Sequence, residues 1–310
     1  MNKIIFGDCR DTMRQLATDG VKVQMCVTSP PYYGLRDYGN DGQIGLEETP
    51  EQYINAMLEV FRCVKDILAD DGVLWLNIGD SYAGSGKGQW VDGEHDPKKK
   101  KTEGMKLNIT KPKDMGLKPK DLIGIPWMLA FALRADGWYL RQDIIWHKPN
   151  PMPESVMDRC TKAHEYIFLL SKSPKYFYDN EAIKEPSEHP EDNRKSRVNT
   201  STAKDFQRDV GNKLAVGDKT YPFRNKRSVW TVNTNPYSGA HFAVFPEELI
   251  EPCILAGSRV GDVVLDPFMG SGTTAQVAQQ LGRKYLGCEL NHDYKTLQDQ
   301  RVAQTSLELA

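Results

Sequence analysis

Apolar runs alternate with helical patterns along the N-terminal part of the chain. Residues 22–29 (KVQMCVTS) and 73–80 (VLWLNIGD) are apolar enough to predict buried strands. Between them, residues 49–72 place apolar side chains three and four positions apart, which predicts an amphipathic helix. We expect Thr49 as the N-cap of this helix, with proline after it, and Gly72 as its stop.

The alternation continues towards the C-terminus. We expect helices at 126–137, 272–282 and 291–304, and strands at 139–148, 163–173, 175–180, 262–268 and 283–290. Strands that alternate with helices build βαβ units. The sequence therefore predicts an α/β fold, with a Rossmann-like, mostly parallel sheet flanked by helices.

Two irregular stretches divide the chain into parts. Residues 81–120 form a loop rich in Gly, Lys and Pro, and residues 151–235 lose their pattern beyond the predicted strands. The parts that follow are 1–150, 151–235 and 236–310, with the α/β pattern in the first and the last.

The bulk composition is that of an ordinary globular protein. Of 310 residues, 39 % are hydrophobic and 26 % are charged. No apolar run approaches the roughly 20 residues that span a bilayer, and the N-terminus has too short an apolar stretch for a signal peptide. We therefore expect a cytoplasmic protein without a membrane partner. The six cysteines are scattered singly without a CxxC pair, which predicts no metal site, and several of them, as in VQMCV and LGCEL, lie in apolar runs that predict buried reduced thiols.

The charges are unevenly distributed, although the formal net charge is only −2. Residues 87–120 and 191–230 each hold ten Lys or Arg and five Asp or Glu. Two basic segments on an otherwise acidic chain suit a polyanionic partner. A loop rich in Lys and Arg can also be a solvated loop that binds no partner, so the charge distribution alone leaves both interpretations open.

A glycine-rich turn follows a predicted strand near the C-terminus. The strand ends at Asp266, and PFMGSG leads from it into a helix that begins at Thr273. Glycines let a ligand approach the backbone, and a helix N-terminus offers free N–H groups. The next strand ends at Glu289, which suits two ribose hydroxyls.

The chemistry of this turn narrows the choice of ligand. The turn lacks the GxxxxGK pattern of a phosphate-binding loop. A carboxylate at Asp266 repels a pyrophosphate but attracts an ammonium group. S-adenosylmethionine carries an ammonium, a ribose and an adenine but no phosphate, so it is the expected cofactor.

The second informative segment is TSPPYY at 28–33, where a buried strand ends in hydroxyls, two prolines and two tyrosines. Together with DPFMGSGTT at 266–274, it resembles the exocyclic-amino DNA methyltransferases. The catalytic motif comes first and the cofactor motif near the C-terminus, which is the order of their beta class. The resemblance implies a circularly permuted methyltransferase fold with a target-recognition region inserted at 151–235.

The resemblance also assigns residues to the cofactor. Asp8, in FGDCRDTM (6–13), is expected to contact the adenine, and HFAVFPEELIEPCI (241–254) to cradle the methionine end. The expected cofactor-binding residues are Asp8, His241, Phe245, Asp266, Pro267, Phe268, Gly270, Ser271, Gly272, Thr273 and Glu289.

The chemistry of the family explains the proline corner. The Ser29 hydroxyl and the Pro30 carbonyl are expected to accept hydrogen bonds from both N–H groups of an exocyclic amine, which aims its lone pair at the sulfonium methyl. Pro30 and Pro31 fix the turn, and Tyr32 stacks on a base flipped out of the duplex. The expected catalytic residues are Ser29, Pro30, Pro31 and Tyr32.

The first motif residue bears on the target base. In the family, serine there leans towards N4 of cytosine and aspartate towards N6 of adenine, so Ser29 favours cytosine and leaves adenine as the alternative. Methylation at C5 needs a Pro-Cys nucleophile, and Pro252-Cys253 lies in the expected cofactor-side helix. His147 and Lys148, at the end of a predicted strand, are candidates for lining the base pocket.

Double-stranded DNA is the expected partner. Arg36 would contact a phosphate or fill the gap left by the flipped base, and Lys98, Lys99 and Lys100 would add salt-sensitive affinity for phosphates. Arginine suits guanine. The candidates for reading bases are Arg194, Arg197, Arg224 and Arg227. A cognate restriction endonuclease and a monomeric or homodimeric state are further expectations.

Other functions stay open from the sequence. RNA and protein-glutamine methyltransferases use a similar Pro-Pro-Tyr corner, but they usually carry the cofactor motif first. A non-catalytic DNA-binding protein on the same fold and an oxidoreductase with a dinucleotide at the glycine turn are alternatives from other classes. Binding of S-adenosylmethionine rather than NAD separates the favoured function from the oxidoreductase.

Overall fold

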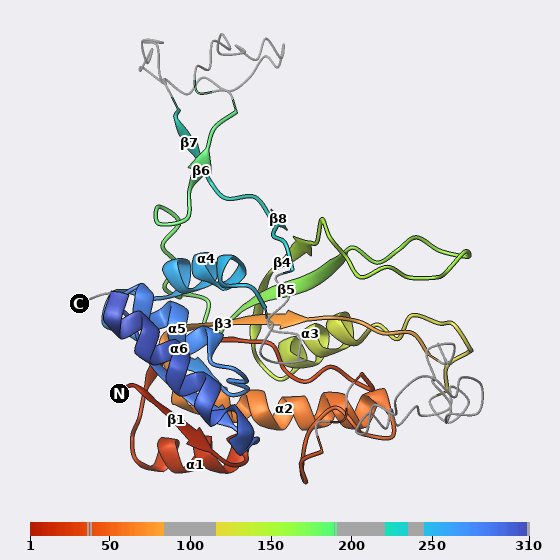
Figure 1. Cartoon of the computed structure of the whole chain (residues 1–310), viewed down its shortest axis with the longest axis horizontal. Helices are drawn as coiled ribbons and strands as arrows, with labels where there is room; N and C mark the ends of the chain where they lie inside the picture. Colours follow the sequence, from red (N-terminus) through yellow and green to blue (C-terminus); the bar gives the residue numbers. More distant parts are fainter. Residues whose placement is uncertain are drawn as a thin grey trace, which may run out of the picture. The chain divides into compact units, whose positions relative to one another are not determined.

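The computed structural model describes residues 1–35, 37, 39–83, 116–188, 190, 221–234 and 245–308. Within these ranges the main element is an eight-stranded sheet (Figure 1). In spatial order its strands are β1 (Lys3–Phe6), β10 (Lys284–Glu289), β9 (Val263–Asp266), β2 (Val23–Thr28), β3 (Leu68–Ile78), β5 (His164–Ser171), β4 (Tyr139–His147) and β8 (Val229–Thr231). Neighbouring strands are parallel except β5, which runs antiparallel to both β3 and β4. The predicted α/β fold is confirmed.

Helices cover both faces of the sheet (Figure 1). On one face α1 packs against α2, and α2 packs against α3; on the other, α5 lies between α4 and α6. Their bounds are α1 (Cys9–Thr18), α2 (Pro50–Ile67), α3 (Ile125–Ala135), α4 (Glu247–Gly257), α5 (Thr273–Gln280) and α6 (Lys295–Glu308), with the short 3₁₀ helix η3 (His292–Tyr294) before α6. In the described part of the chain, no helix is both long and apolar enough to cross a membrane.

Both faces of the central strands are apolar because both are covered. On β2, Cys26 belongs to the core that α2 and α3 cover. Its neighbour Met25 faces the other way, towards α4, where a Cβ on Gly257 would lie 3.0 Å from the Met25 sulfur. This double coverage is why residues 22–29 form a continuous apolar run in the sequence.

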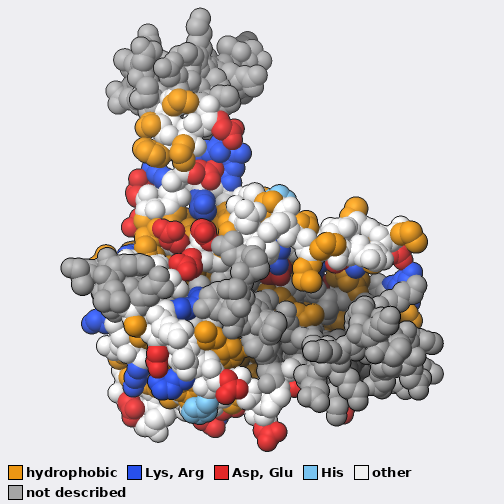
Figure 2. Space-filling view, viewed as in Figure 1, with side chains coloured by type: hydrophobic (Ala, Val, Ile, Leu, Met, Phe, Trp, Pro, Cys, Tyr) orange, Lys and Arg blue, Asp and Glu red, His pale blue; other side chains and the backbone are white. Residues whose placement is uncertain are grey.

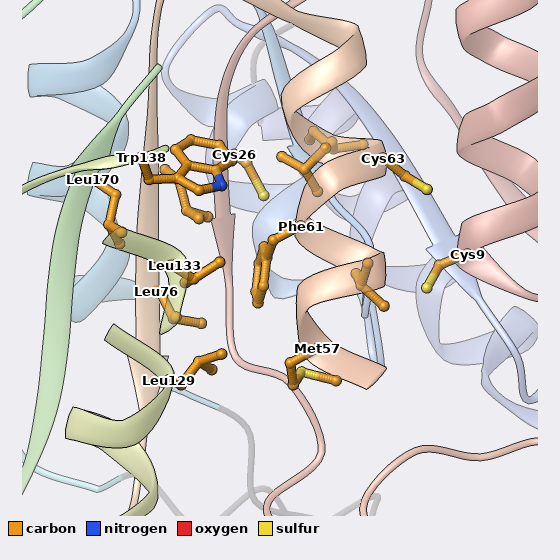
Figure 3. Packing of buried hydrophobic residues seen from close by; sticks show 14 of the residues in the cluster. Cys9, Cys26, Met57, Phe61, Cys63, Leu76, Leu129, Leu133, Trp138 and Leu170 are labelled. Carbon is orange, nitrogen blue, oxygen red and sulfur yellow. The ribbon is translucent and has the colours of Figure 1, made fainter. Parts of the chain in front are cut away.

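The largest core lies between α2, α3 and the sheet (Figure 3). Met57 and Phe61 of α2 point towards Leu129 and Leu133 of α3, and all four side chains are fully buried. Five of the six cysteines are buried, and Cys160 is exposed. Burial raises the pKa of the Cys9 thiol to about 12, so it stays protonated at neutral pH. The predicted burial of the thiols in the apolar runs, Cys26 and Cys288, is confirmed.

The helix expected at 49–72 begins as predicted but ends earlier. The Thr49 side chain accepts the N–H of Gln52, and the Gln52 side chain accepts that of Thr49, which makes a capping box. The prediction of Gly72 as the stop is wrong, because α2 ends at Ile67. Leu68 already pairs with Val23 of β2, and Gly72 lies inside β3.

The strand expected at 175–180 is also wrong. The chain leaves the sheet after Ser171 and crosses to α4 without strand pairing. The Phe177 N–H donates to the Asp71 carbonyl (2.8 Å), and the Asp179 N–H donates to the Ala256 carbonyl (2.9 Å). Two separate anchors therefore hold an apolar segment that looked like a strand.

A small second unit spans Asn180–Arg227. Its described part holds β6 (Glu185–Pro186) paired with β7 (Phe223–Arg224). The unit is narrower than the expected region 151–235, because that range also contains β5 and β8 of the main sheet. Along the chain the unit follows β5 and precedes β8, and the expected target-recognition region at 151–235 stays a prediction.

Candidate active site

The proline corner and the glycine turn lie side by side at one edge of the sheet. Strand β2 ends at Thr28 and β9 ends at Asp266, and the two strands are parallel neighbours through the pairs Met25–Val264 and Cys26–Leu265. The carboxyl ends of parallel neighbours meet at the same edge, which is where α/β sheets bind ligands. The adjacency that the motif order implies is confirmed.

A buried carboxylate joins the two motifs directly. The Thr28 hydroxyl donates to Asp266 Oδ1 (2.6 Å), and the Thr274 hydroxyl donates to Oδ2 (2.6 Å). The Phe268 N–H also donates to Oδ1 (3.0 Å). Asp266 is 1 % exposed, and desolvation raises its pKa to about 6 while these three donors lower it. The carboxyl group is therefore ionised at neutral pH.

The glycine turn is shaped by the end of the next strand. Glu289, the last residue of β10, accepts the Gly270 N–H (2.6 Å) on Oε2 and the Asn291 N–H (2.8 Å) on Oε1. Burial raises the pKa of Glu289. Gly272 adopts φ +92° at the N-cap of α5, a left-handed conformation that glycine tolerates best.

Both motifs line one cleft of about 980 Å³. The Ser271 side chain at its wall is buried, and its hydroxyl has no hydrogen-bond partner among the described residues. Of the expected site residues that the structure describes, the cleft is lined by Asp8, Ser29, Pro30, Pro31, Tyr32, Phe245, Asp266, Pro267, Phe268, Gly270, Ser271, Thr273 and Glu289. Gly272 does not line it. His241 lies outside the described residues.

Asp8 shapes the part of the cleft next to β1. It is the N-cap of α1, where its carboxylate accepts the Arg10 N–H (2.7 Å) and pairs with the Arg10 guanidinium (2.5 Å). Hydrogen bonding from the Arg10 side chain lowers the pKa of Asp8. The capping role fixes the position of the carboxylate.

The proline corner is held by a polar network. The Tyr32 hydroxyl donates to Glu165 Oε2 (2.7 Å) and lies 3.4 Å from the Ser29 hydroxyl. Glu165 also forms an ion pair with Lys148 and accepts a hydrogen bond from Asn77 Nδ2 (3.3 Å). Burial is the main cause that raises the pKa of Tyr32 well above its usual value, so the phenol stays protonated.

The backbone beside Tyr32 leaves room for its ring. A Cβ on Gly79 would lie 2.6 Å from Cε2 of Tyr32, so a larger residue there would displace the ring. The Tyr53 hydroxyl donates to the Pro31 carbonyl (2.9 Å), which anchors the proline corner to α2.

Sequence reasoning did not find Asn77 and Glu165. Asn77 is on β3 and Glu165 on β5. The antiparallel register pairs Asn77 with Ile167, so Glu165 lies two positions along β5 from the residue opposite Asn77, within reach of its amide. No local pattern marks a residue that becomes functional through strand pairing. Lys148, a candidate from the sequence, lines the cleft. His147, the other candidate, does not line it; its side chain is exposed, with Nδ1 3.2 Å from the Thr231 hydroxyl.

The expected DNA-binding residues are mostly outside the described ranges. Arg224 and Arg227 are described, in the unit Asn180–Arg227, and both pair with Glu185 and Glu188. Their role in reading bases stays a prediction. The residues outside the described ranges are Arg36, Lys98, Lys99, Lys100, Arg194 and Arg197.

Comparison with known proteins decides the family. The model of the DNA methylase family, which covers N6- and N4-methyltransferases, matches residues 23–300. The chain belongs to this family. Type II methyltransferase M.SmaI of Serratia marcescens is 50 % identical over 300 residues, which are 97 % of this chain and 90 % of that protein. Type II methyltransferase M.Cfr9I of Citrobacter freundii is 49 % identical and covers 93 % of this chain and 83 % of its own length.

Solved structures share the fold of this DNA methylase. The PvuII DNA methyltransferase (cytosine-N4-specific) matches with a TM-score of 0.62 at 17 % identity, covering 97 % of this chain and 86 % of its own. TTHA0409 of Thermus thermophilus, a putative DNA modification methylase complexed with S-adenosyl-L-methionine, matches with a TM-score of 0.58 at 24 % identity, covering 98 % and 94 %. The expected methyltransferase fold is confirmed.

Thr28→Val should destabilise the protein by about 1–3 kcal/mol, because it leaves a buried carboxylate without one of its donors. Urea denaturation measures the change in the free energy of unfolding. Thr18→Val is the matched control: Thr18 is exposed on α1, and its hydroxyl bonds the Arg14 carbonyl (3.0 Å). Equal losses in the two variants would contradict the joining role of Thr28.

Tyr32→Phe and Glu165→Gln should be coupled in a double-mutant cycle. The charge-assisted bond from the Tyr32 phenol is lost or weakened in each single variant. The double variant should therefore lose about 1 kcal/mol less free energy of unfolding, measured by urea denaturation, than the sum of the losses in the two single variants. The control is Tyr33, whose hydroxyl donates to the Glu48 carbonyl (3.2 Å). The losses in stability of Tyr33→Phe and Glu165→Gln should be additive, without coupling. Additive losses in the Tyr32 cycle would argue against the network.

Proposed function

We propose that this DNA methyltransferase transfers the methyl group of S-adenosylmethionine to N4 of a cytosine that is flipped out of double-stranded DNA. Membership of the DNA methylase family shows that the reaction is methyl transfer and that the substrate is DNA. The observation that carries the finer assignment is the shared cleft, in which Ser29 stands next to the turn that Asp266 builds. The chemistry of the groups in that cleft supports each part of the proposal.

The residues of the glycine turn fit the cofactor. Asp266 provides a buried negative charge for the ammonium group, and the unpartnered Ser271 hydroxyl is available for the carboxylate. Glu289 has lone pairs left for the ribose hydroxyls, and Asp8 is placed for the adenine. The bound cofactor supplies an electrophilic methyl group on a sulfonium.

The proline corner fits an exocyclic amine. The Pro31 carbonyl is occupied by the Tyr53 hydroxyl, whereas nothing in the described part of the chain donates to the Pro30 carbonyl. The Pro30 carbonyl and the half-buried Ser29 hydroxyl accept the two N–H groups and orient the lone pair of the amine. The Tyr32 ring, tethered through its phenol, stacks on the flipped base.

The identity of the base and the partners are finer assignments. Ser29 favours N4 of cytosine, and N6 of adenine is the alternative that the same corner chemistry allows. A cognate restriction endonuclease as partner and a monomeric or homodimeric state are part of the same proposal. The unit Asn180–Arg227 is proposed as the target-recognition element, with its arginines released from Glu185 and Glu188 to read bases.

Ser29→Ala should reduce methyl transfer by at least about 100-fold, because one of the two acceptors that orient the amine is lost. The dissociation constant for S-adenosylmethionine should change less than about twofold. Plasmid DNA is methylated, digested to nucleosides and analysed by mass spectrometry, with N4-methylcytosine as the expected product. Detection of N6-methyladenine instead would make adenine the target base. Full activity of Ser29→Ala would show that Ser29 has no role in catalysis.

Asp266→Asn should weaken S-adenosylmethionine binding by roughly 10- to 100-fold at pH 8, the loss typical of a hydrogen bond to a charged group. In the parent protein the carboxyl group protonates as pH falls through its pKa of about 6, so affinity should fall there. The variant should show no such fall. Calorimetric titration at several pH values measures both.

The same substitution separates binding from folding. The folded-state pKa of Asp266 is raised, so its ionised form costs stability above about pH 6 and this cost disappears as pH falls. Asp266→Asn should therefore unfold no more easily than the parent at pH 8. The control Asp66→Asn, at an exposed position of α2, should leave cofactor affinity unchanged. Equal affinity of Asp266→Asn and the parent would exclude the ammonium contact.

A further inference from the structure

We propose that the loop between β4 and β5, residues 148–163, places methionine side chains as an apolar wedge in the DNA duplex next to the flipped base. The proposal rests on the proposed function, since it assumes that the cleft receives a base from the duplex. It assigns a role to a surface feature that the chemistry of the cleft does not explain.

The loop exposes apolar side chains that a free protein would normally bury. Met152 is 85 % exposed, Met157 is 103 % exposed, and Val156 is 36 % exposed. Figure 2 shows hydrophobic side chains at the projecting end of this loop. Methionine is flexible and polarisable, which suits contact with irregular apolar surfaces such as the faces of stacked bases.

The loop is held in place although it projects. Pro149, Pro151 and Pro153 each fix a backbone dihedral. The Asn150 amide donates to the Thr234 carbonyl (3.0 Å) and accepts the Thr234 N–H (3.0 Å) beyond β8. A pre-ordered loop loses little conformational entropy when it inserts, which favours a wedge over a disordered arm.

The charges of the loop are neutralised. Glu154 pairs with Arg159 (2.5 Å), whose guanidinium also lies 4.0 Å from the ring centre of Tyr82. Asp158 pairs with Lys120 (2.5 Å). Neither acid is therefore left as an uncompensated negative charge against the phosphates. Of the other cations in the loop, Lys148 pairs with Glu165 and Lys162 donates to the Asp80 carbonyl (3.2 Å). Because these basic groups are engaged within the protein, apolar contact is the main means by which the loop binds DNA.

The loop is continuous with the catalytic cleft. Asn150, Pro151, Met152 and Glu154 line the same cleft as Ser29. A base that reaches Ser29 leaves a gap in the stack close to this lip. Unstacking costs a few kcal/mol, and apolar side chains inserted between base steps are a known way of offsetting that cost.

The test compares two DNA substrates in single-turnover methylation. One duplex carries the target base in a normal pair, and the other carries an abasic site opposite the target, so that little flipping work remains. Met152→Ala/Met157→Ala should slow methylation of the paired duplex by about 10-fold or more, because the cost of unstacking the target base is no longer offset by the inserted side chains. On the abasic duplex its rate should return to within about twofold of the parent.

Two control variants separate a wedge from general damage. Met152→Leu/Met157→Leu keeps the apolar volume and should retain the parent rate on the paired duplex. Val260→Ala removes a 75 % exposed apolar side chain that does not line the cleft and should change neither rate. An alanine variant that is equally slow on both duplexes, or as fast as the parent on the paired one, would overturn the proposal.

Failure of the proposed function has a different signature. A parent enzyme that methylates neither duplex would reject the proposed target chemistry. The wedge is then judged by fluorescence titration of the paired duplex. Weaker binding of the alanine variant than of the leucine variant supports the wedge, and equal binding overturns it.

Discussion

One buried contact, from the Thr28 hydroxyl to the Asp266 carboxylate, determines how this active site is assembled. The two residues are 238 positions apart in the sequence and 2.6 Å apart in space. Parallel pairing of β2 and β9 brings the strand ends together, and the hydroxyl then fixes the proline corner against the glycine turn. The Thr274 hydroxyl completes the arrangement from the first turn of α5. The proline corner and the glycine turn thus share one rigid support.

The same contact explains how a negative charge survives inside the protein. Desolvation opposes ionisation of Asp266, while three donors favour it, and the balance leaves a carboxylate at neutral pH. A cationic cofactor group would relieve the remaining cost. The site is therefore better adapted to a bound ammonium group than to an empty or phosphate-filled cleft.

The reversed strand β5 supplies the polar group that holds Tyr32 of the proline corner. It carries Glu165 to the side of Tyr32, where the carboxylate is balanced by Lys148. A buried ion pair contributes little net stability, but it specifies one arrangement of the groups around it. Here that arrangement holds Tyr32, and the loop that leads into β5 carries the exposed Met152, which lines the cleft, and the exposed Met157.

Local signals in the sequence determined the elements and the two motifs. The Thr49 cap, the glycine turn after Asp266 and the proline corner after Thr28 depend on residues within a few positions of one another, so they are legible without coordinates. The motif order also indicated the sheet edge at which they meet. Tertiary structure decided what depends on distant partners: Leu68 joins β3 because Val23 pairs with it, and residues 175–180 are held by Asp71 and Ala256 instead of by a strand. Asn77 and Glu165 became site residues for the same reason, since strand pairing, not spacing along the chain, brings them to Tyr32.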